Sequence, residues 1–338
     1  MMLKDISSTR TVFVVKKLFA TPVARAFAAL LLVFLMGLCF NADGTFFKWV
    51  THRDMLRQVS VYGILACGMT LVIITAGIDL AVGSVLGLTA VMFSIFSIHF
   101  RWSPALAILA TIAVGAACGA ASGGLVARFK IQPFIATLAM MVFARGVAKF
   151  VSGGQKISTA VLAEDGNYVF VDLPRFFEFL NSKILYDNVA VVTIVFLVCL
   201  IICWLILAKL RWGRYFYAIG GNEEAARLSG VPVSLIKVLA FGLSGLFSAV
   251  AGICQAVQEQ QGDPEAGVAY ELSAIAIVVI GGTSLMGGRG SIWLTLLGAL
   301  TIGYLEKILS INAVSEATRL MLTGLIIVGA VLFQKTRK

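Results

Sequence analysis

Long apolar runs recur along almost the whole chain, and they constrain its fold more than any other feature. A helix needs roughly 20 apolar residues to cross the hydrocarbon core of a bilayer, so runs of this length predict membrane-spanning helices. Hydrophobic residues make up 59% of the 338 residues and charged residues 13%, whereas soluble proteins carry roughly 25% charged residues. A soluble domain is therefore excluded, and we predict an all-α integral membrane protein.

The apolar runs predict about ten transmembrane helices. We expect them at residues 25–40, 56–76, 79–98, 104–127, 133–151, 189–207, 235–257, 271–280, 292–311 and 317–333. This divides the chain into an N-terminal tail (residues 1–24), a transmembrane domain (25–334) and a C-terminal tail (335–338). Two long polar loops interrupt the transmembrane domain, at residues 152–188 and 209–237.

The distribution of charge orients these helices in the membrane. The formal net charge is +10, with 27 Lys and Arg against 17 Asp and Glu. The basic residues gather in the two tails and in the loop 209–237, as in the cytoplasmic loops of membrane proteins. We therefore expect both termini and this loop in the cytoplasm, and the more acidic loop 152–188 outside. The charge indicates a lipid bilayer as partner and not nucleic acid. We expect no cleavable signal peptide, because no small-x-small pattern follows Phe40.

Two segments of similar pattern interrupt the apolar runs. Residues 70–84 and 276–290 each have an aliphatic run, then a Gly-containing polar break, then a Gly-rich restart. Such breaks are either tight turns or parts of a transport pathway, since irregular backbone in a membrane must lie against protein or water. Asp79 in the first break is either an N-cap of the third span or a residue that faces water. Arg145, in the fifth span, is expected to pair with a carboxylate or with helix carbonyl groups and not to contact a substrate.

The residue patterns of known catalytic and metal sites are missing from the sequence. Gly242-Leu-Ser-Gly245 resembles the motif of intramembrane serine proteases, but the two histidines, His52 and His99, lie far upstream. Packing of small residues explains Gly242, Ser244 and Gly245 better. The sequence has no Gly-Lys dipeptide and hence no Walker A loop. The six cysteines lie in apolar runs without His or carboxylate neighbours, so we expect no metal site and no enzymatic activity.

The cytoplasmic loop 209–237 contains the pattern of a short helix. Asn222 can cap it, Glu223 and Glu224 in its first turn favour the positive end of the helix dipole, and Gly230 ends it before Pro232. A helix of about two turns is unstable alone in water. It is therefore held either by a groove on a partner protein or by its own helix bundle.

Four segments of the chain together resemble a known family. They are residues 68–84 (GMTLVIITAGIDLAVGS), 130–138 (KIQPFIATL), 218–230 (AIGGNEEAARLSG) and 280–290 (IGGTSLMGGRG). In this order they resemble the permease subunits of bacterial ABC importers of the ribose type. The resemblance covers about residues 56–332. It implies a ten-span fold similar to that of vitamin B12 importers, in the bacterial inner membrane, and import of a monosaccharide.

The resemblance also implies partners and site residues. A second permease subunit (the same chain or a different one), an ATP-binding cassette ATPase and a periplasmic sugar-binding protein are expected, and ATP is hydrolysed by the ATPase, with no cofactor bound to this chain. The loop helix is similar to the family's coupling helix, which seats on the ATPase. The coupling residues are expected to be Gly221, Asn222, Glu223, Ala225, Ala226, Arg227, Ser229, Gly230 and Pro232. For the substrate pathway we select Asp79, Ser84, Thr283 and Ser284.

Other functions remain open at this stage. Within the family, the solute could be a nucleoside, the autoinducer-2 signal or a branched-chain amino acid. From another class, an ion-coupled secondary transporter could use Asp79 and Glu271, although it would have no role for the loop helix. The residues that contact the solute cannot be read from the sequence.

Overall fold

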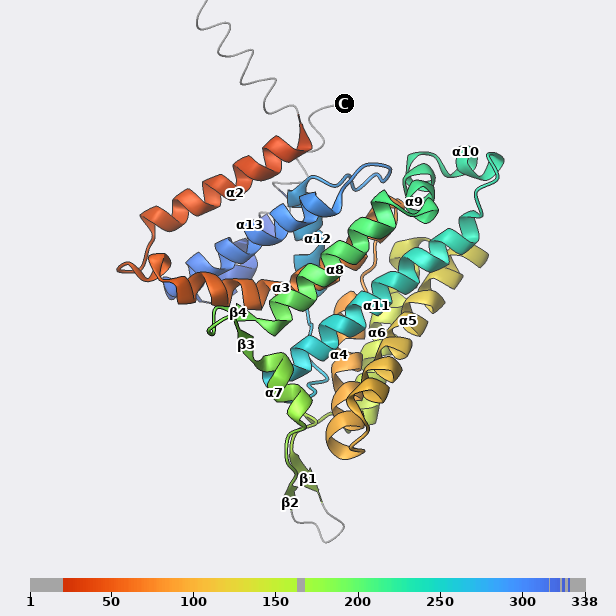
Figure 1. Cartoon of the computed structure of the whole chain (residues 1–338). Coiled ribbons are helices and arrows are strands. Elements are labelled where there is room, and N and C mark those ends of the chain that lie inside the picture. The colour runs from red at the N-terminus through yellow and green to blue at the C-terminus, as the bar shows by residue number, and fades with distance from the viewer. Residues whose placement is uncertain (1–20, 163–167, 316, 323, 326–327, 329–338) are drawn as a thin grey trace, which may run out of the picture.

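The chain is mostly helical (Figure 1). A computed structural model describes residues 21–162, 168–315, 317–322, 324, 325 and 328. Its helices are α2 (Pro22–Cys39), α3 (Trp49–Ile74), α4 (Val82–Ser94), α5 (Pro104–Arg128), α6 (Pro133–Ser152), α7 (Arg175–Asn181), α8 (Val191–Ala208), α9 (Arg211–Gly221), α10 (Glu223–Leu228), α11 (Val233–Glu259), α12 (Tyr270–Gly281) and α13 (Ile292–Ile311). A 3-10 turn (Thr45–Phe47) precedes α3, and a π-helical turn (Ile95–His99) extends α4.

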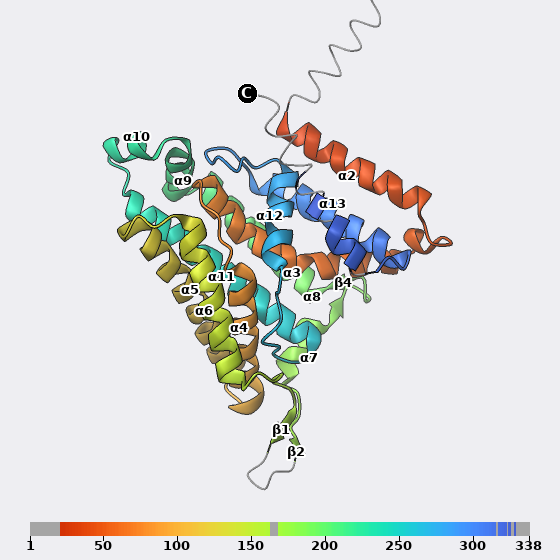
Figure 2. The ribbon, with the colours of Figure 1, turned by 180° about the vertical axis from the view of Figure 1, so that it is seen from behind.

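Two small hairpins belong to the loop that was predicted to be outside. Strand β1 (Ala160–Leu162) pairs antiparallel with β2 (Tyr168–Phe170), and β3 (Lys183–Ile184) pairs antiparallel with β4 (Val189–Ala190). Figures 1 and 2 show the β1–β2 hairpin and α10 at opposite ends of the molecule. We call these the hairpin end and the α10 end.

The first nine predicted spans each coincide with a helix. Eight helices in the described residues are long and apolar enough to cross a membrane, and α12 is a shorter apolar helix. The tenth predicted span and both predicted tails lie partly or wholly outside the described residues, so the total of ten spans stays a prediction. The prediction that Asp79 could be the N-cap of the third span was wrong. The third span begins at Val82 with Ala81 as its N-cap, so Asp79 does not cap the helix.

Local sequence signals explain where several helices begin and end. Proline occupies the first helical position of α2, α5 and α6, where its missing N–H costs nothing. Thr21 caps α2 by accepting a hydrogen bond from the Ala24 N–H. Gly153 ends α6 in the left-handed conformation with φ 61°.

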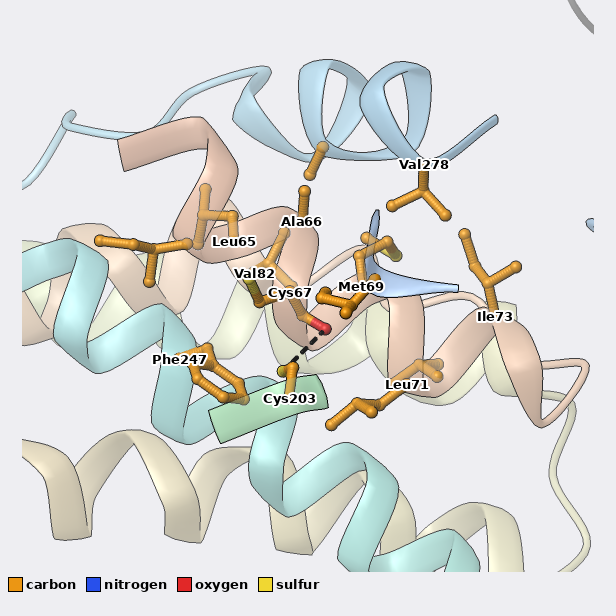
Figure 3. Packing of buried hydrophobic residues seen from close by; sticks show 14 of the residues in the cluster. Leu65, Ala66, Cys67, Met69, Leu71, Ile73, Val82, Cys203, Phe247 and Val278 are labelled. Carbon is orange, nitrogen blue, oxygen red and sulfur yellow. Dashed lines mark hydrogen bonds between the residues drawn. The ribbon is translucent and has the colours of Figure 1, made fainter. Parts of the chain in front are cut away.

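Helix α3 lies at the centre of the bundle. Its residues from Ile64 to Ile74 are completely buried, and their side chains pack on residues from α4, α8, α11 and α12 (Figure 3). The Cys203 thiol of α8 lies 3.7 Å from the Cys67 carbonyl oxygen of α3 (Figure 3). The cysteines are all free, and Cys67, Cys199, Cys203 and Cys254 are buried among apolar side chains, where a thiol acts as a small hydrophobic group.

Glycines bring α5 and α11 into close contact. A Cβ on Gly119 would meet the backbone carbonyl oxygen of Phe241, and a Cβ on Gly245 would meet the carbonyl oxygen of Gly115. Gly115, Gly119 and Gly123 are spaced four residues apart, which is the small-residue pattern of close helix pairs in membranes. Packing through Gly245 is thus as predicted, whereas Gly242 has its nearest neighbours at 3.8 Å and is not required by contact.

Candidate functional site: a short loop helix beside two chain breaks

Helix α10 has the local structure that its sequence predicts. The Asn222 side chain accepts a hydrogen bond of 2.9 Å from the Ala225 N–H, and Asn222 is the N-cap. Glu223 and Glu224 lie in the first turn. Gly230 follows the helix with φ 81°, a conformation that L side chains rarely adopt. The cap, the first turn and the stop signal therefore act together to form this short helix.

Ion pairs stabilise α10 from within and join it to α11. Arg227 contacts Glu223 at 3.1 Å and Glu224 at 3.2 Å, and Lys237 of α11 contacts Glu223 at 2.6 Å. Ala226 is buried against the bundle, whereas Leu228 is 82% exposed. Pairs of this kind contribute about 0.2–0.5 kcal/mol each on an exposed helix. The helix thus keeps its shape but presents an exposed apolar side chain beside an exposed cation.

Helix α9, which precedes α10, was not predicted. Gly213, Phe216 and Ile219 face the bundle at a spacing of three residues, and Trp212 and Arg214 are exposed on the opposite side. This amphipathic spacing is present in the sequence, but a run of 11 residues with flanking arginines has too low a mean hydropathy to stand out beside the membrane spans.

Three glycine-containing segments meet where α9 ends. The Gly288 N–H donates a hydrogen bond of 2.9 Å to the carbonyl oxygen of Ile74, the last residue of α3. A Cβ on Gly220 would collide with that same carbonyl oxygen, and one on Gly287 would lie 2.8 Å from the backbone nitrogen of Ala76. The two breaks that the sequence predicted separately are therefore in direct backbone contact with each other and with the end of α9. We call residues 74–77, 220–222 and 287–288 the junction.

A cavity of about 310 Å³ lies between the junction and α10. Thr75 to Gly77 of the first break, Gly220 to Glu223, and Lys237 and Phe241 of α11 line most of it. The cavity shows that α10 packs on the bundle incompletely at this point. A displacement of α10 has space here before it meets the first break.

The structure does not gather the four predicted pathway residues in one place. Asp79 is buried, accepting hydrogen bonds from the Ser244 hydroxyl at 2.7 Å and from the Ala81 N–H at 3.0 Å. Ser84 is buried on α4, whereas Thr283 and Ser284 lie in the second break. None of the four lines the cavity between the junction and α10. Their assignment to a pathway stays a prediction, and the bonds of Asp79 tie the first break to α11.

Ser244 shows why the protease motif is misleading. Its hydroxyl donates to the Asp79 carboxylate in the interior of the bundle, and it is 1% exposed. His52 packs against Phe46, Trp49 and Tyr304 instead, and His99 lies 3.4 Å from the Ser158 carbonyl oxygen. The serine thus has a structural partner, and neither histidine approaches it.

At the hairpin end, three basic residues hold the segment between α11 and α12. Arg145 of α6 donates to the carbonyl oxygens of Pro264 and Ala266, which belong to the loop between α11 and α12 and not to a helix as predicted. Lys149 contacts Glu265 at 2.5 Å, and Lys156 contacts Asp263 at 2.9 Å. The hydrogen bond and the charge of Asp263 raise the pKa of Lys156 above its usual value, because both favour the ammonium form. We call residues 262–269 the clamped segment.

Comparison with known proteins decides the family. The profile of a family described as "branched-chain amino acid transport system / permease component" matches residues 53–331. The chain belongs to this permease family. The match begins near the start of α3 and includes α10, the junction and the clamped segment.

Relatives of the permease at substantial identity carry the names of sugar importers. The ribose import permease protein RbsC of Escherichia coli K12 is 40% identical over 308 residues, which span 91% of this permease and 92% of the relative. The fructose import permease protein FrcC of Rhizobium meliloti is 38% identical, with 85% and 78% coverage. The L-arabinose transport system permease protein AraH of E. coli K12 is 34% identical, with 87% and 85% coverage. No solved structure gives a significant match. These relatives are transport components, and the permease accordingly is not an enzyme.

Proposed function

We propose that the permease is the membrane-spanning subunit of an ATP-driven importer, and that it passes a monosaccharide from a periplasmic binding protein to the cytoplasm. The observation that carries this proposal is the similarity to ribose, fructose and arabinose import permeases over most of the chain. The description of the family also names branched-chain amino acids. Because the three relatives named above are all sugar permeases, we favour a sugar.

The α10 end is proposed to face the cytoplasm of the bacterial cell. Arg128, Arg211, Arg214 and Lys237 lie on or beside the loops at this end, in agreement with the positive-inside rule. With a tenth span, as in the fold of vitamin B12 importers, this proposed orientation would put both termini in the cytoplasm and the hairpin end in the periplasm. The protein would then be a multi-pass protein of the inner membrane.

Helix α10 is proposed to couple the permease to an ATP-binding cassette ATPase. Exposed Leu228 would enter a groove on the ATPase, and Ala225, which is also exposed, would permit close approach. Arg227 is already paired with two carboxylates of its own helix, so it would contribute a neutralised ion cluster and not a free cation. Ser229 bonds back to the Ala225 carbonyl oxygen and closes the helix ahead of Gly230 and Pro232.

The junction offers a physical route from α10 to the membrane spans. Gly221 and Asn222 join α10 directly to α9, and Gly220 touches the end of α3 and the second break. When the nucleotide domains of the ATPase close, α10 would move as a rigid body and displace both breaks together. The pathway residues Asp79, Ser84, Thr283 and Ser284 lie on or next to these breaks and would move with them.

Affinity purification tests this proposal. The tagged chain, extracted from bacterial inner membrane in mild detergent, is expected to retain a stoichiometric ATPase that mass spectrometry identifies. A second permease sequence in the same fraction would indicate a heterodimer, and its absence a homodimer. The proposal fails if the chain is recovered alone and moves sugar in liposomes with an ion gradient and no ATP.

One variant addresses α10 directly. Replacing Arg227 with Glu would place three carboxylates on one short helix, so we expect normal insertion but loss of the bound ATPase. Arg227→Lys is the matched control, because it keeps the positive charge. Equal ATPase recovery with both variants would exclude α10 as the coupling element.

A further inference from the structure

A polar cavity of about 610 Å³ lies at the hairpin end. Its volume is within the range of about 300–1,000 Å³ that is typical of small-molecule pockets. It lies where α3 begins, α11 ends, α12 begins and α13 ends, which are segments distant in the sequence. Its polar lining includes Arg57, Gln58, Tyr62, Gln258, Tyr270 and Glu306.

The charges of the lining are nearly balanced. Four cationic side chains line the cavity, Arg53, Arg57, Lys183 and Arg319, against the three carboxylates of Asp54, Glu259 and Glu306. A ligand with a full charge would meet side chains of its own sign as well as of the opposite sign. The mixture of the two fits a ligand that is polar but carries no net charge.

The amide groups of the lining favour hydroxyl groups as ligands. Gln58, Gln255 and Gln258 each offer two donor hydrogens and an acceptor oxygen, and a hydroxyl group likewise donates and accepts. Gln255 already donates to Glu259 at 2.5 Å, and Gln258 to the Arg57 carbonyl oxygen at 3.4 Å. These bonds fix the wall side chains while leaving further donor and acceptor positions for a ligand.

Two tyrosines give the cavity an aromatic wall. The rings of Tyr62 and Tyr270 have centroids 4.5 Å apart and an interplanar angle of 52°. Aromatic rings combine a large apolar surface with a polar hydroxyl group. Such a wall can pack on the carbon face of a compact solute while the glutamine side chains bind its hydroxyl groups.

Glu306 contributes a carboxylate to the lining of the cavity. It belongs to α13, one of the eight apolar helices long enough to cross a membrane. A carboxylate in such a helix is costly unless it faces a water-filled cavity or a partner. Glu306 and Arg319 line the same cavity. A solute whose hydroxyl groups hydrogen-bond to these side chains can therefore enter without leaving buried polar groups unsatisfied.

We propose that this cavity is a binding site for a small neutral polyhydroxylated solute, of the monosaccharide class, within a single permease subunit. The inference rests on the proposed function, because it makes the cavity the place at the hairpin end where the solute arrives before it crosses. The solute would bind weakly, since a site on a transport route must also release it. The cavity would then contribute to selection among solutes alongside the binding protein.

Ligand-observed NMR on the purified permease in lipid nanodiscs tests the inference, with no binding protein and no ATPase present. The probes are D-ribose, D-fructose and L-arabinose, with D-ribose 5-phosphate as an anion and choline as a cation. The double variant Gln58→Leu and Gln258→Leu removes two amides from the wall at nearly constant volume. Gln155→Leu is the matched control, because Gln155 is exposed at the same end but does not line the cavity.

The expected result is saturation transfer to at least one neutral sugar, with a Kd near the millimolar range that rises about tenfold or more in the double variant and stays unchanged in the control. The inference is overturned if no sugar binds, if the double variant binds as the wild type does, or if the phosphate or choline binds more tightly than the sugars.

Transport and ATPase retention are measured on the same variants. A permease that transports sugar without cavity-dependent binding overturns this inference alone, whereas cavity-dependent binding by a chain that retains no ATPase overturns the proposed function alone.

Discussion

The α10 end and the hairpin end of the molecule are held together by different kinds of contact. At the α10 end, the junction consists of backbone against backbone, with glycines wherever a Cβ would collide. At the hairpin end, the clamped segment is held by basic side chains, of which Lys149 and Lys156 are solvent-exposed. Backbone contacts cannot adjust by changing rotamers, while exposed ion pairs form and break easily. The first end is thus suited to transmit a displacement and the second to yield to one.

The largest effect is expected from Gly220→Val. The new side chain would collide with the backbone of Ile74 and Gly288, neither of which can move aside alone. Overpacking of this kind costs about 3 kcal/mol, so we expect a clear fall in the apparent melting temperature of the purified chain and loss of transport. Gly221→Ala is the control, because no atom lies within 4 Å of a Cβ at that position. Equal melting temperatures of the two variants would contradict the rigid junction.

A smaller effect is expected from Arg145→Met at the opposite end. The variant keeps a flexible, unbranched apolar side chain but leaves the Pro264 and Ala266 carbonyl oxygens without their cationic donor. Hydrogen bonds to a charged group contribute about 1.5–3 kcal/mol, and we expect about 1.5 because Arg145 is half-buried. Hydrogen exchange should accelerate in the clamped segment and not in α10. Uniform acceleration throughout the chain would show that the two ends are not independent.

Removing the cap of α10 by Asn222→Ala should cost about 1 kcal/mol. The loss is confined to the first turn, so we expect faster exchange of the Ala225 amide while the junction remains protected. Asn222→Asp retains an acceptor oxygen and should restore protection. If the alanine variant is as protected as the wild type, packing and not capping maintains the helix.

The smallest effect is expected from Lys149→Gln. This side chain is 50% exposed in its contact with Glu265, and exposed ion pairs contribute about 0–1 kcal/mol. Melting temperature and exchange should be nearly unchanged, in contrast to Arg145→Met one helical turn away. A loss as large as that of Arg145→Met would mean that the clamped segment depends on charge in general and not on the buried hydrogen bonds.

The sequence predicted what depends on local signals. Hydropathy placed nine helices, most of their ends within a few residues, although α3 begins at Trp49 and not at residue 56 as predicted. The cap at Asn222 and the stop at Gly230 appeared as expected. Contacts between distant segments were not accessible in this way. Nothing local indicates that Ile74 meets Gly288, or that Asp79 finds Ser244 on α11.

The polar cavity was missed for a related reason. Glu306, taken alone, is a charged residue near the end of an apolar helix, and this position by itself indicates no function. Arg57 and Gln258 likewise read as residues at the ends of membrane spans. Only the packing of α3, α11, α12 and α13 brings these residues to one cavity, and that packing depends on the apolar faces of all four helices together.

The burial of α3 has a consequence for how the protein responds to its lipid. In the apolar stretch of α3, 83% of the residues are buried, and in that of the α4 span 89% are buried. The corresponding shares are 17% in α2 and 22% in α6. Bilayers of different thickness force exposed helices to tilt, and in this chain that adjustment falls on the outer helices. Because α3 carries the Ile74 contact of the junction and is shielded on all sides, the geometry at the α10 end should stay constant from thin to thick membranes. The same permease could then be driven equally well across the range of lipid compositions that a cell adopts as its temperature changes.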